Sequence, residues 1–565
     1  MFNHSQENGN KILSWAKNLN SSLVLVNNQS IDYNAVCRTV DKQKCELKMN
    51  GAEFLTKTAI RAGIEVCFAN AGTTEMPIVL ALDSEPGIKA ILGLFEGVCT
   101  GAADGYGRML DKPALALLHL GPGFANGIAN LHNAQKAKTP LLNLIGEHAT
   151  WHRAADPPSA MNIEPLASTV SGWYKTNESP TMLSQDLAEA VAVSMYGQIS
   201  SLIIPSDHQW AECTNIEIAT PEFSFDPIDS DSIDKAVQLL KAHNKTGLIM
   251  GGRALRQRGL QAAARIKAAT GCDLLTNSSP AYVDRGTGLP DVTRIPYFPD
   301  SAIKLMSQYE ALVLAGTKEP VTFFGYNGFD SYVLKEKQKR LQIATDRQNA
   351  AEALECLADA LNARFSSNIP DNILARSSRP SIPQGGLTPE KVCLALAALL
   401  PENAIIVDEG LTTSFAYYPL TAGLPPHAFL KIAGGAIGYG MPCAVGASVA
   451  CPERPVINFQ ADGSALYTIQ ALWTEARESL NIITLICANR SYNILKMELS
   501  RAGITSIGPK VLSLIDLDHP AINWVKLAEG MGVPAVSVNS IDGLAKEFHR
   551  ALSESGPHLI EMMIV

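Results

Sequence analysis

The chain has 565 residues, which is beyond the size at which one hydrophobic core keeps growing, so the sequence predicts two to three domains. Hydrophobic residues make up 46%, charged residues 18% and aromatic residues 6%, as in a globular protein and not in a disordered or fibrous one. The net charge of -9 and the absence of a basic run argue against nucleic acid as a partner. The eleven cysteines are scattered and form no CxxC pair, so we expect reduced core residues.

The apolar runs are too short to span a bilayer, which predicts no membrane partner and a cytoplasmic protein. Residues 1–50 differ from the rest, because Asn and Gln recur and apolar periodicity is poor. They lack an apolar h-region and contain a single arginine, so they do not read as a targeting peptide. We expect a poorly ordered N-terminal extension, either a dispensable tail or the product of an upstream start codon, with Met49 as the functional start.

From Gly51 onward helical segments alternate with short apolar runs, a βαβ rhythm that predicts parallel strands covered by helices on both faces. The fold class expected is α/β, with three doubly wound parallel-sheet domains at residues 51–220, 232–365 and 387–565. Pro- and Ser-rich linkers at 221–231 and 366–386 separate them. The predicted strands are Val66–Phe68, Ala114–Leu118, Leu141–Ile145, Leu202–Ile204, Leu248–Met250, Ala311–Leu314, Ala404–Val407, Val456–Phe459, Ile482–Cys487 and His558–Met563.

The strongest chemical signal lies between Val456 and Asn489, where a strand, a helix and a second strand follow one another. Asp462 and Asn489 each come directly after a strand of this unit, so both side chains should lie at the carboxyl edge of the sheet, where open α/β sheets bind ligands. Their oxygens suit Mg²⁺, which takes few protein ligands and completes its shell with phosphate oxygens and water. The carbonyl of Ser491 is a candidate third ligand.

The residues beside Asp462 have a second candidate role in holding a phosphate group. Gly463 allows close approach of the backbone, and Ser464 with the first helical turn offers amide donors. An ordinary strand-to-helix turn also uses Asp, Gly and Ser, so the tripeptide alone is weak evidence. With its spacing to Asn489 the segment resembles the thiamine-diphosphate motif that begins GDG and closes with asparagine. Ala461 stands where that motif has its first glycine.

A second constellation lies in the first predicted domain, where Glu96 and Gly97 lead into the small residues of Gly101–Arg108. It resembles the family's glutamate at the start of a helix. The resemblance implies that Glu96 contacts the aminopyrimidine ring of the cofactor and promotes its deprotonation. A carboxylate that shares a proton with a ring nitrogen away from water suits this task. A solvated helix face is the alternative interpretation.

His119 follows a predicted buried strand and precedes a Gly-Pro-Gly-x-x-Asn turn at residues 121–126, which is similar to a turn of the same family. It stands at the position of a catalytic histidine in benzoylformate decarboxylase, so the resemblance implies a role with the carboxylate or proton of a 2-oxo acid. A satisfied structural histidine is the alternative. His148 and His152 are expected to be loop histidines that could line an entrance.

In the third predicted domain, residues 434–442 resemble the family segment that bends the cofactor. The resemblance implies that Ile437 wedges between the two cofactor rings and that the carbonyl of Gly435 holds the 4′-amino group. Thr412 is a candidate diphosphate contact. Glycines at this density could instead serve tight helix packing.

The resemblance covers Gly51–Val565 and is to the thiamine-diphosphate enzymes that include acetolactate synthase large subunits and benzoylformate decarboxylase. It implies thiamine diphosphate and Mg²⁺ as cofactors and a small 2-oxo acid as substrate, cleaved or joined at its carbonyl. In this family the cofactor lies between two subunits, so Glu96 and Asp462 are expected to meet across a homodimer, which is often doubled to a homotetramer.

The reaction within this family stays open at the level of sequence. Glu498 aligns with a tryptophan that favours the larger acceptor in acetolactate synthases, and a glutamate would repel an acceptor carboxylate. The second histidine of benzoylformate decarboxylase finds no counterpart in Thr322–Gly328, which carries Phe323, Phe324 and Tyr326 instead.

Other interpretations rest on glycine patterns or on the loss of catalysis. A true acetolactate synthase catalytic subunit and a non-catalytic cofactor-binding paralogue are the two alternatives within the family. Gly251–Arg253 is a weak nucleotide signal, which leaves FAD possible but unsupported. Ala69–Gly72 does not supply the glycine fingerprint that a nicotinamide dehydrogenase needs.

Overall fold

The computed structural model describes residues 49–214, 217–362 and 373–565. The predictions for the N-terminal extension lie outside the described residues, except for Met49 and Asn50, and the first part of the 366–386 linker also lies outside them. Met49–Asn50 form β1, which pairs antiparallel with β8 (Glu212–Cys213). Asn50 also caps the next helix, accepting the N–H of Glu53 at 2.9 Å while the Glu53 carboxylate accepts the N–H of Asn50 at 2.8 Å.

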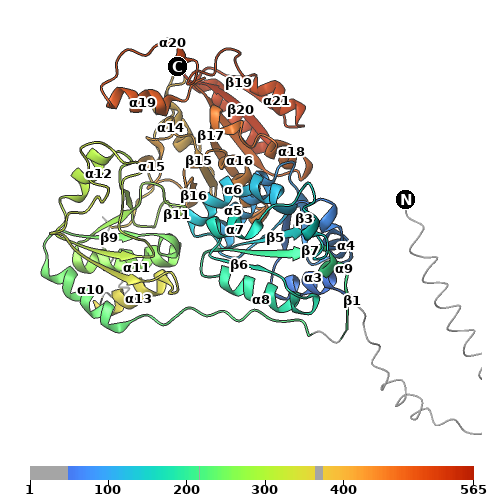
Figure 1. The fold of residues 1–565 in the computed structure, drawn as a ribbon. Helices are drawn as coiled ribbons and strands as arrows, with labels where there is room; N and C mark the ends of the chain where they lie inside the picture. The colour runs from blue at the N-terminus through green and yellow to red at the C-terminus, as the bar shows by residue number, and fades with distance from the viewer. Residues whose placement is uncertain (1–48, 215–216, 363–372) are drawn as a thin grey trace, which may run out of the picture. The chain divides into compact units, whose positions relative to one another are not determined.

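The first sheet has six parallel strands in the order β3-β2-β4-β5-β7-β6, seen in the blue to green part of Figure 1. Leu115 and Leu117 pack on one face and Ala116 and Leu118 on the other, as the two-residue period of a strand requires. Its strands are β2 (Val66–Asn70), β3 (Lys89–Leu92), β4 (Leu115–Leu118), β5 (Leu141–Glu147), β6 (Trp173–Thr176) and β7 (Ile199–Pro205).

Helices cover both faces of this sheet. Residues of α5, α6 and α7 share a core with one face, and residues of α3, α4 and α8 with the other. The helices are α3 (Gly51–Arg61), α4 (Met76–Ser84), α5 (Glu96–Leu110), α6 (Leu120–Ala137), α7 (Ile163–Val170), α8 (Leu183–Ser194) and α9 (Ser206–Trp210), with short 3-10 turns η1 (Thr73–Glu75), η2 (Arg153–Ala155) and η3 (Pro180–Met182).

The central sheet has five parallel strands in the order β12-β10-β9-β13-β14. They are β9 (Thr246–Met250), β10 (Asp273–Thr276), β12 (Thr293–Arg294), β13 (Ala311–Ala315) and β14 (Lys339–Ala344). The covering helices are α10 (Ser230–Ala242), α11 (Gln257–Thr270), α12 (Pro299–Met306) and α13 (Ala350–Ala360), with a 3-10 turn η4 (Gly252–Leu255). Between β13 and β14 the chain runs through a long irregular loop, residues 316–338.

The third sheet has seven strands in the order β11-β16-β15-β17-β18-β20-β19. They are β11 (Tyr282–Arg285), β15 (Ile405–Glu409), β16 (His427–Lys431), β17 (Val456–Ala461), β18 (Ile482–Ala488), β19 (Ala535–Val538) and β20 (His558–Met563). Its helices are α14 (Pro389–Leu399), α15 (Tyr417–Leu420), α16 (Gly440–Ala450), α17 (Asp462–Ala465), α18 (Ala471–Arg477), α19 (Asn493–Arg501), α20 (Pro509–Leu512), α21 (Trp524–Gly530) and α22 (Ile541–Ser553).

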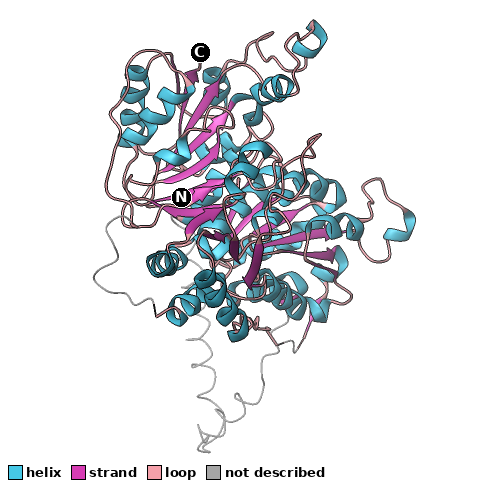
Figure 2. Ribbon diagram, turned by 90° about the vertical axis from the view of Figure 1, so that its left-hand side faces the viewer, coloured by secondary structure: helices cyan, strands magenta, loops and turns pink. Residues whose placement is uncertain are grey.

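The predicted α/β class with several parallel sheets is confirmed, and Figure 2 shows helices on both sides of the strands. Within the three large sheets one strand differs from the all-parallel expectation. β11, from the segment assigned to the central domain, pairs antiparallel with β16 at the edge of the third sheet. Arg285 at its end fixes this addition, because its buried guanidinium donates to the Thr421 hydroxyl at 2.7 Å and to the Tyr418 carbonyl at 3.2 Å.

The first and third sheets share one hydrophobic core through α5 and α16. A Cβ on Gly105 would lie 2.2 Å from the carbonyl oxygen of Cys443, and one on Gly446 would lie 1.9 Å from that of Ala102. Only glycine therefore allows the two helix backbones to approach so closely. The small residues that the sequence places between Gly101 and Gly107 serve this contact.

Each sheet reverses its winding next to the first of its parallel strands. In the first sheet β3 lies on one side of β2 and β4 on the other; in the third, β16 and β17 flank β15; in the central sheet, β10 and β13 flank β9. At such a switch point the two connections run to opposite faces and leave a crevice beyond the carboxyl ends of the strands. The fold therefore offers three crevices in which a ligand can bind.

Among residues 49–214, 217–362 and 373–565, no helix combines the length and the apolar character that a bilayer crossing needs. The nine cysteines of the same residues are free, and all but Cys356 are buried.

The buried imidazole of His427, at the start of β16, should make stability depend on pH. Its Nδ1 bonds the Pro425 carbonyl at 2.8 Å, while Nε2 is buried without a partner. Burial lowers the pKa of His427 from 6.5 to about 4, so the unfolded chain binds the extra proton between these values. This contribution is complete above pH 6.5 and is lost as the pH falls towards 4. Between pH 7.5 and 5 it should lower the free energy of unfolding by about 2 kcal/mol.

Urea unfolding of the wild type and of His427→Gln at both pH values measures this effect. The glutamine variant should lose about 2 kcal/mol less than the wild type over the interval. His549→Gln, at an exposed histidine of α22, is the matched control and should keep the wild-type dependence. Equal pH dependence in the wild type and His427→Gln would show that His427 is not buried in its neutral form.

Candidate active site

Three side chains with acid-base chemistry gather at the switch point of the first sheet. Glu75 follows β2, His119 follows β4, and Glu96 begins α5 directly after β3. The Nδ1 atom of His119 lies 2.8 Å from Oε2 of Glu75, whose side chain is fully buried, whereas the imidazole is 31% exposed. Glu75 Oε2 also accepts the N–H of Gly72 at 2.8 Å. The buried carboxylate thus orients the imidazole and leaves its Nε2 edge accessible.

Glu96 stands beside His119 and is half-buried. The side-chain amide of Asn126 donates to Glu96 Oε2 at 3.0 Å. A Cβ on Gly123 would lie 3.1 Å from Glu96 Oε1 and 3.4 Å from the Cβ of His119. The Gly-Pro-Gly turn therefore makes room for both side chains, and Asn126 at the end of the same motif holds the carboxylate.

The predicted metal ligands meet at the carboxyl edge of the third sheet. Asp462 follows β17, and Asn489 follows the neighbouring strand β18. Asp462 is 2% exposed and accepts the N–H of Gly463 at 2.8 Å and that of Arg490 at 2.6 Å. Asn489 Oδ1 accepts the N–H of Ser491 at 3.0 Å. These backbone bonds hold the two side chains in place and leave lone pairs free on their oxygens.

The oxygen atoms of Asp462 and Asn489 are of the kind that Mg²⁺ prefers as ligands. Burial raises the pKa of Asp462 to about 6, and a cation beside the carboxylate would keep it ionised. No cluster of three or more His, Cys, Asp or Glu that could hold a metal occurs in the part of the chain that the structure describes. An ion at Asp462 and Asn489 would therefore depend on phosphate oxygens and water for the rest of its shell, as Mg²⁺ does.

The segment of residues 434–440, between β16 and α16, is held from the side of α6. The Asn133 amide donates to the Ala436 carbonyl at 2.7 Å and accepts the Ala436 N–H at 3.2 Å. The Asn130 amide donates to the Gly438 carbonyl at 3.2 Å, and Nε2 of His132 lies 3.1 Å from the Gly434 carbonyl. Positions 435 and 438 have φ of +78° and +93°, which glycine adopts without strain. Residue 437, the predicted wedge, is therefore presented on a rigid loop.

A buried carboxylate holds the same segment from below. Glu409, at the end of β15, is 0% exposed and accepts the N–H of Gly438 at 2.8 Å and that of Gly440 at 2.6 Å. Gln460 donates to Glu409 at 3.0 Å and to the Ser464 hydroxyl at 2.7 Å. Burial raises the pKa of Glu409, and these hydrogen bonds oppose the rise. Through Glu409 and Gln460 the segment is tied to the turn that carries Asp462.

Thr412 and Ser464 both lie close to the switch point of the third sheet. Thr412 is half-buried in the turn after β15, and Ser464 lies in α17 after β17. The hydroxyl of Ser464 donates to the Ala461 carbonyl at 3.1 Å. A Cβ on Gly463 would lie 2.5 Å from the ring of Tyr492, so glycine is needed there for space.

The sequence reasoning missed Glu75, Glu409, Asn130 and Asn133. Glu75 and Glu409 come at or just after the ends of parallel strands, which is the signal that identified His119 and Asp462. Asn130 and Asn133 are three residues apart on the buried face of α6, and paired buried amides indicate a specific hydrogen-bonding task.

The two groups of candidate residues stay separate within one chain. Among the described residues no hydrogen bond or ion pair joins Glu96 or His119 to Asp462 or Asn489. His148 and His152 lie in the loop after β5 with their rings 5.7 Å apart, beside Trp151, which is 77% exposed.

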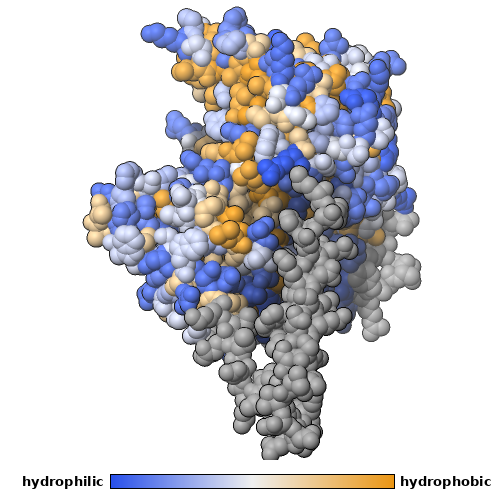
Figure 3. Space-filling view, turned by 90° about the vertical axis from the view of Figure 1, so that its right-hand side faces the viewer, coloured by the Kyte–Doolittle hydropathy of each residue, from blue (hydrophilic) through white to orange (hydrophobic). Residues whose placement is uncertain are grey.

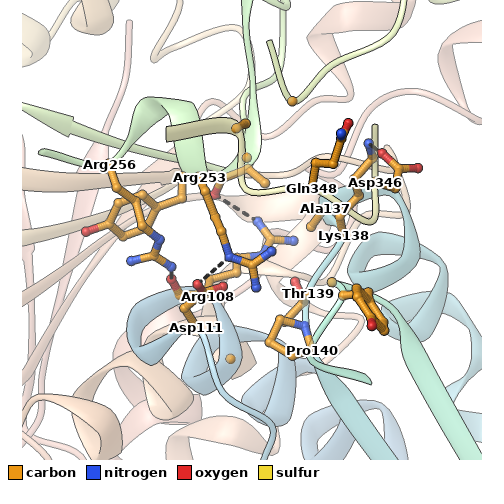
Figure 4. A pocket seen from close by; sticks show the side chains of 18 of the residues that line it. Arg108, Asp111, Ala137, Lys138, Thr139, Pro140, Arg253, Arg256, Asp346 and Gln348 are labelled. Atoms are coloured by element: carbon orange, nitrogen blue, oxygen red, sulfur yellow. Dashed lines mark hydrogen bonds and ion pairs between the residues drawn. The ribbon is translucent and has the colours of Figure 1, made fainter. Parts of the chain in front are cut away.

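The crevice of the central sheet is a large cavity of about 760 Å³ beyond β9 and β13. The glycines that hinted at a nucleotide have another task there, since a Cβ on Gly316 would lie 2.4 Å from the Gly251 carbonyl oxygen. Arg253 is also engaged, donating to Asp111 at 2.6 Å (Figure 4). It donates to the Met195 carbonyl at 2.8 Å as well. FAD therefore gains no support from Gly251–Arg253.

Comparison with known proteins agrees with the geometry. Residues 49–166 match the family model of the thiamine pyrophosphate enzyme N-terminal TPP binding domain, and residues 410–562 match that of the C-terminal TPP binding domain. The chain belongs to the thiamine pyrophosphate enzymes, and thiamine diphosphate is its cofactor.

Particular relatives cover nearly the whole described chain. A Mycobacterium tuberculosis protein named "Putative acetolactate synthase large subunit IlvX" is 43% identical over 521 residues, which are 91% of this chain and 99% of that protein. Benzoylformate decarboxylase of Pseudomonas aeruginosa is 26% identical, covering 89% and 96%. The structure of a thiamine diphosphate-dependent 4-hydroxybenzoylformate decarboxylase from Rhodococcus jostii RHA1 has the same fold, with a TM-score of 0.80, 22% identity and coverage of 91% and 99%.

Proposed function

We propose that the protein is a thiamine-diphosphate and Mg²⁺ dependent enzyme that decarboxylates 2-oxo acids or joins the resulting fragment to a second carbonyl compound. The proposal rests on two groups of side chains, one in the first sheet and one in the third. Glu75, Glu96 and His119 meet at the switch point of the first sheet, and Asp462 and Asn489 meet beside the clamped 434–440 segment of the third.

The residues present fit the cofactor at both ends. Asp462, Asn489 and the Ser491 carbonyl would hold Mg²⁺ and through it the diphosphate, with Thr412, Gly463 and Ser464 beside it. When bound, the cofactor supplies a ring carbon that attacks the substrate carbonyl and a ring system that takes up the electrons released with carbon dioxide.

The 434–440 segment would define the shape of the bound cofactor. Gly435 and Ile437 face the cofactor in this proposal, with the Gly435 carbonyl accepting from its amino group. Because Glu409 and Asn133 fix the loop through backbone bonds, the carbonyl is oriented before the cofactor arrives.

The chain's own proton chemistry is assigned to the first sheet. Glu96 would share a proton with the aminopyrimidine nitrogen, a task for which Asn126 orients the carboxylate. His119, held through Nδ1 by buried Glu75, would present Nε2 to the substrate carboxylate or to the carbon that is protonated after carbon dioxide leaves.

We further propose that two copies of the chain complete each active site, with Glu96 of one subunit facing Asp462 of the other. Exposed apolar side chains lie next in sequence to both groups of site residues. They include Met76, which is 38% exposed, Leu94 at 44% and Tyr467 at 54%. Figure 3 shows that apolar residues gather in patches on one face of the molecule. Exposed apolar patches of this kind are usually covered in a subunit interface. A homodimer is the minimum assembly, and a homotetramer is its doubled form.

The test is turnover by purified protein with thiamine diphosphate and Mg²⁺, offered pyruvate, 2-oxobutyrate, benzoylformate and branched 2-oxo acids. We expect carbon dioxide with an aldehyde or a hydroxyketone from at least one of them. Acetolactate from pyruvate would contradict the interpretation of Glu498 and favour acetolactate synthase. Cofactor binding without turnover of any of these acids would favour either a substrate outside this set or the non-catalytic paralogue.

A further inference from the structure

A row of aromatic rings leads away from the 434–440 segment into the central domain. The ring of Phe323 covers Gly435, where a Cβ would lie 2.6 Å from its Cζ atom. Tyr297 lies 5.2 Å from Phe323 between ring centroids, and Phe324 lies 4.9 Å from it. Phe324 is in turn 6.4 Å from Tyr326. These rings come from the 316–338 loop and from the turn before α12, so the first and second halves of the central domain both contribute.

The row ends at a carboxylate. The Tyr326 hydroxyl donates to Glu498 Oε1 at 3.1 Å, which joins the loop to α19 of the third domain. Burial raises the pKa of the Tyr297 and Tyr326 hydroxyls, so both stay protonated at neutral pH. Since an ionised carboxylate only accepts, Tyr326 donates to Glu498.

Glu498 carries the free negative charge of this cluster. The basic residues of its own helix are engaged elsewhere, with Lys496 paired to Asp516 at 2.6 Å and Arg501 to Asp300 at 2.5 Å. The guanidinium of Arg501 also lies over the ring of Phe298 at 4.1 Å. Among the described residues no ion pair involves Glu498, and Tyr326 bonds only its Oε1 atom in the hydrogen bonds found there.

We propose that this row is the side-chain pocket for the substrate, and that it selects 2-oxo acids with a flat aromatic side chain ending in a hydrogen-bond donor. With the reacting carbonyl at Gly435, the side chain would lie along Phe323 and reach the Tyr326–Glu498 pair. Oε2 of Glu498 accepts from a distal hydroxyl or amino group, and the same charge repels a distal carboxylate. A substrate with a small aliphatic side chain would leave most of these aromatic rings without a contact. This inference rests on the proposed activity on 2-oxo acids and names its substrate class.

The test compares 4-aminobenzoylformate, benzoylformate and 4-carboxybenzoylformate as substrates of the holoenzyme. We expect kcat/KM for the amino compound to exceed that for the carboxy compound by at least about 100-fold, equivalent to two well-placed polar contacts. In Glu498→Gln this ratio should shrink at least about tenfold, because the amide removes the charge. Tyr326→Phe should shrink it less, since Glu498 keeps its charge but loses its orienting bond.

Two control variants test whether a change in this ratio is specific to Glu498 and Tyr326. Glu529→Gln removes an exposed carboxylate on α21, and Tyr332→Phe removes the hydroxyl of a tyrosine that is 60% exposed in the same loop. Both should keep the wild-type ratio. An amino-to-carboxy ratio near one in the wild type, or an unchanged ratio in Glu498→Gln, would overturn the inference.

Binding distinguishes this inference from the proposed function. The 2-hydroxy acids that correspond to the three substrates carry a hydroxyl group in place of the reactive ketone. Their Kd values can therefore be measured by calorimetry on the holoenzyme without turnover. The same order of affinity without turnover of the 2-oxo acids would uphold the pocket and reject the activity. Turnover of all three acids with equal Kd values for their analogues would uphold the activity and reject the pocket.

Discussion

Replacing Glu96 by glutamine should lower kcat at least about 100-fold, the usual size of a lost general acid-base contribution. Glutamine keeps the shape of the side chain and can still contact Asn126, but it cannot share a proton with a ring nitrogen. The rate of hydrogen-deuterium exchange at the reactive carbon of bound thiamine diphosphate, measured by quenched-flow and NMR, should fall with kcat. Because the carboxylate is half-buried and makes one side-chain hydrogen bond, we expect the melting temperature to change little.

Glu178→Gln is the matched control, since Glu178 is an exposed carboxylate of the same domain, and it should retain wild-type exchange and kcat. Wild-type activity in Glu96→Gln would remove Glu96 from the catalytic residues. A loss of kcat with unchanged exchange would instead assign Glu96 to a later step than cofactor activation.

Replacing Asp462 by alanine should weaken the binding of thiamine diphosphate in saturating Mg²⁺ at least about 100-fold, equivalent to about 2.7 kcal/mol. The change removes the only carboxylate of the proposed metal set. Titration calorimetry with the cofactor, at several Mg²⁺ concentrations, measures the loss.

Asp542→Asn, at an exposed position of α22, is the control and should bind the cofactor like the wild type. Chelation of Mg²⁺ from the wild type should weaken cofactor binding to about the same extent as the alanine variant, and should have little further effect on that variant. Equal cofactor affinity with and without Mg²⁺ would contradict the metal assignment.

The strands that the sequence predicted are those in which most side chains are apolar. Leu141–Ile145 extends to β5, and Ile482–Cys487 to β18, because central parallel strands are buried on both faces and show this as a continuous run. The other strands escaped the same reasoning, and two of them show the physical reason. β16 begins with His427 and ends with Lys431, both buried, and a buried polar residue cannot be distinguished from an exposed one in a single sequence. β3 begins with two exposed residues and lies at an edge.

For the candidate site, local sequence patterns predicted the chemical residues but not the residues that support them. His119, Asp462 and Asn489 could be named because each follows an apolar strand, and the carboxyl ends of parallel strands meet at one edge of a sheet. Glu96 was named only from its resemblance to a family glutamate at the start of a helix. Their roles remain predictions. The spacing of Asp462 and Asn489 along one βαβ unit made their meeting predictable, and the structure places them at neighbouring strand ends.

What the sequence by itself determined was therefore the α/β class, its central strands and the membership of a cofactor family carried by local motifs. Only the tertiary structure decided which distant residues support those motifs. Glu75 behind His119, Glu409 beneath the 434–440 segment, and Glu498 at the end of the ring row all act across long sequence separations. Such contacts depend on how whole elements pack, and no local periodicity encodes them. For that reason the cofactor could be inferred from motifs, while the choice of substrate is decided by the packed pocket.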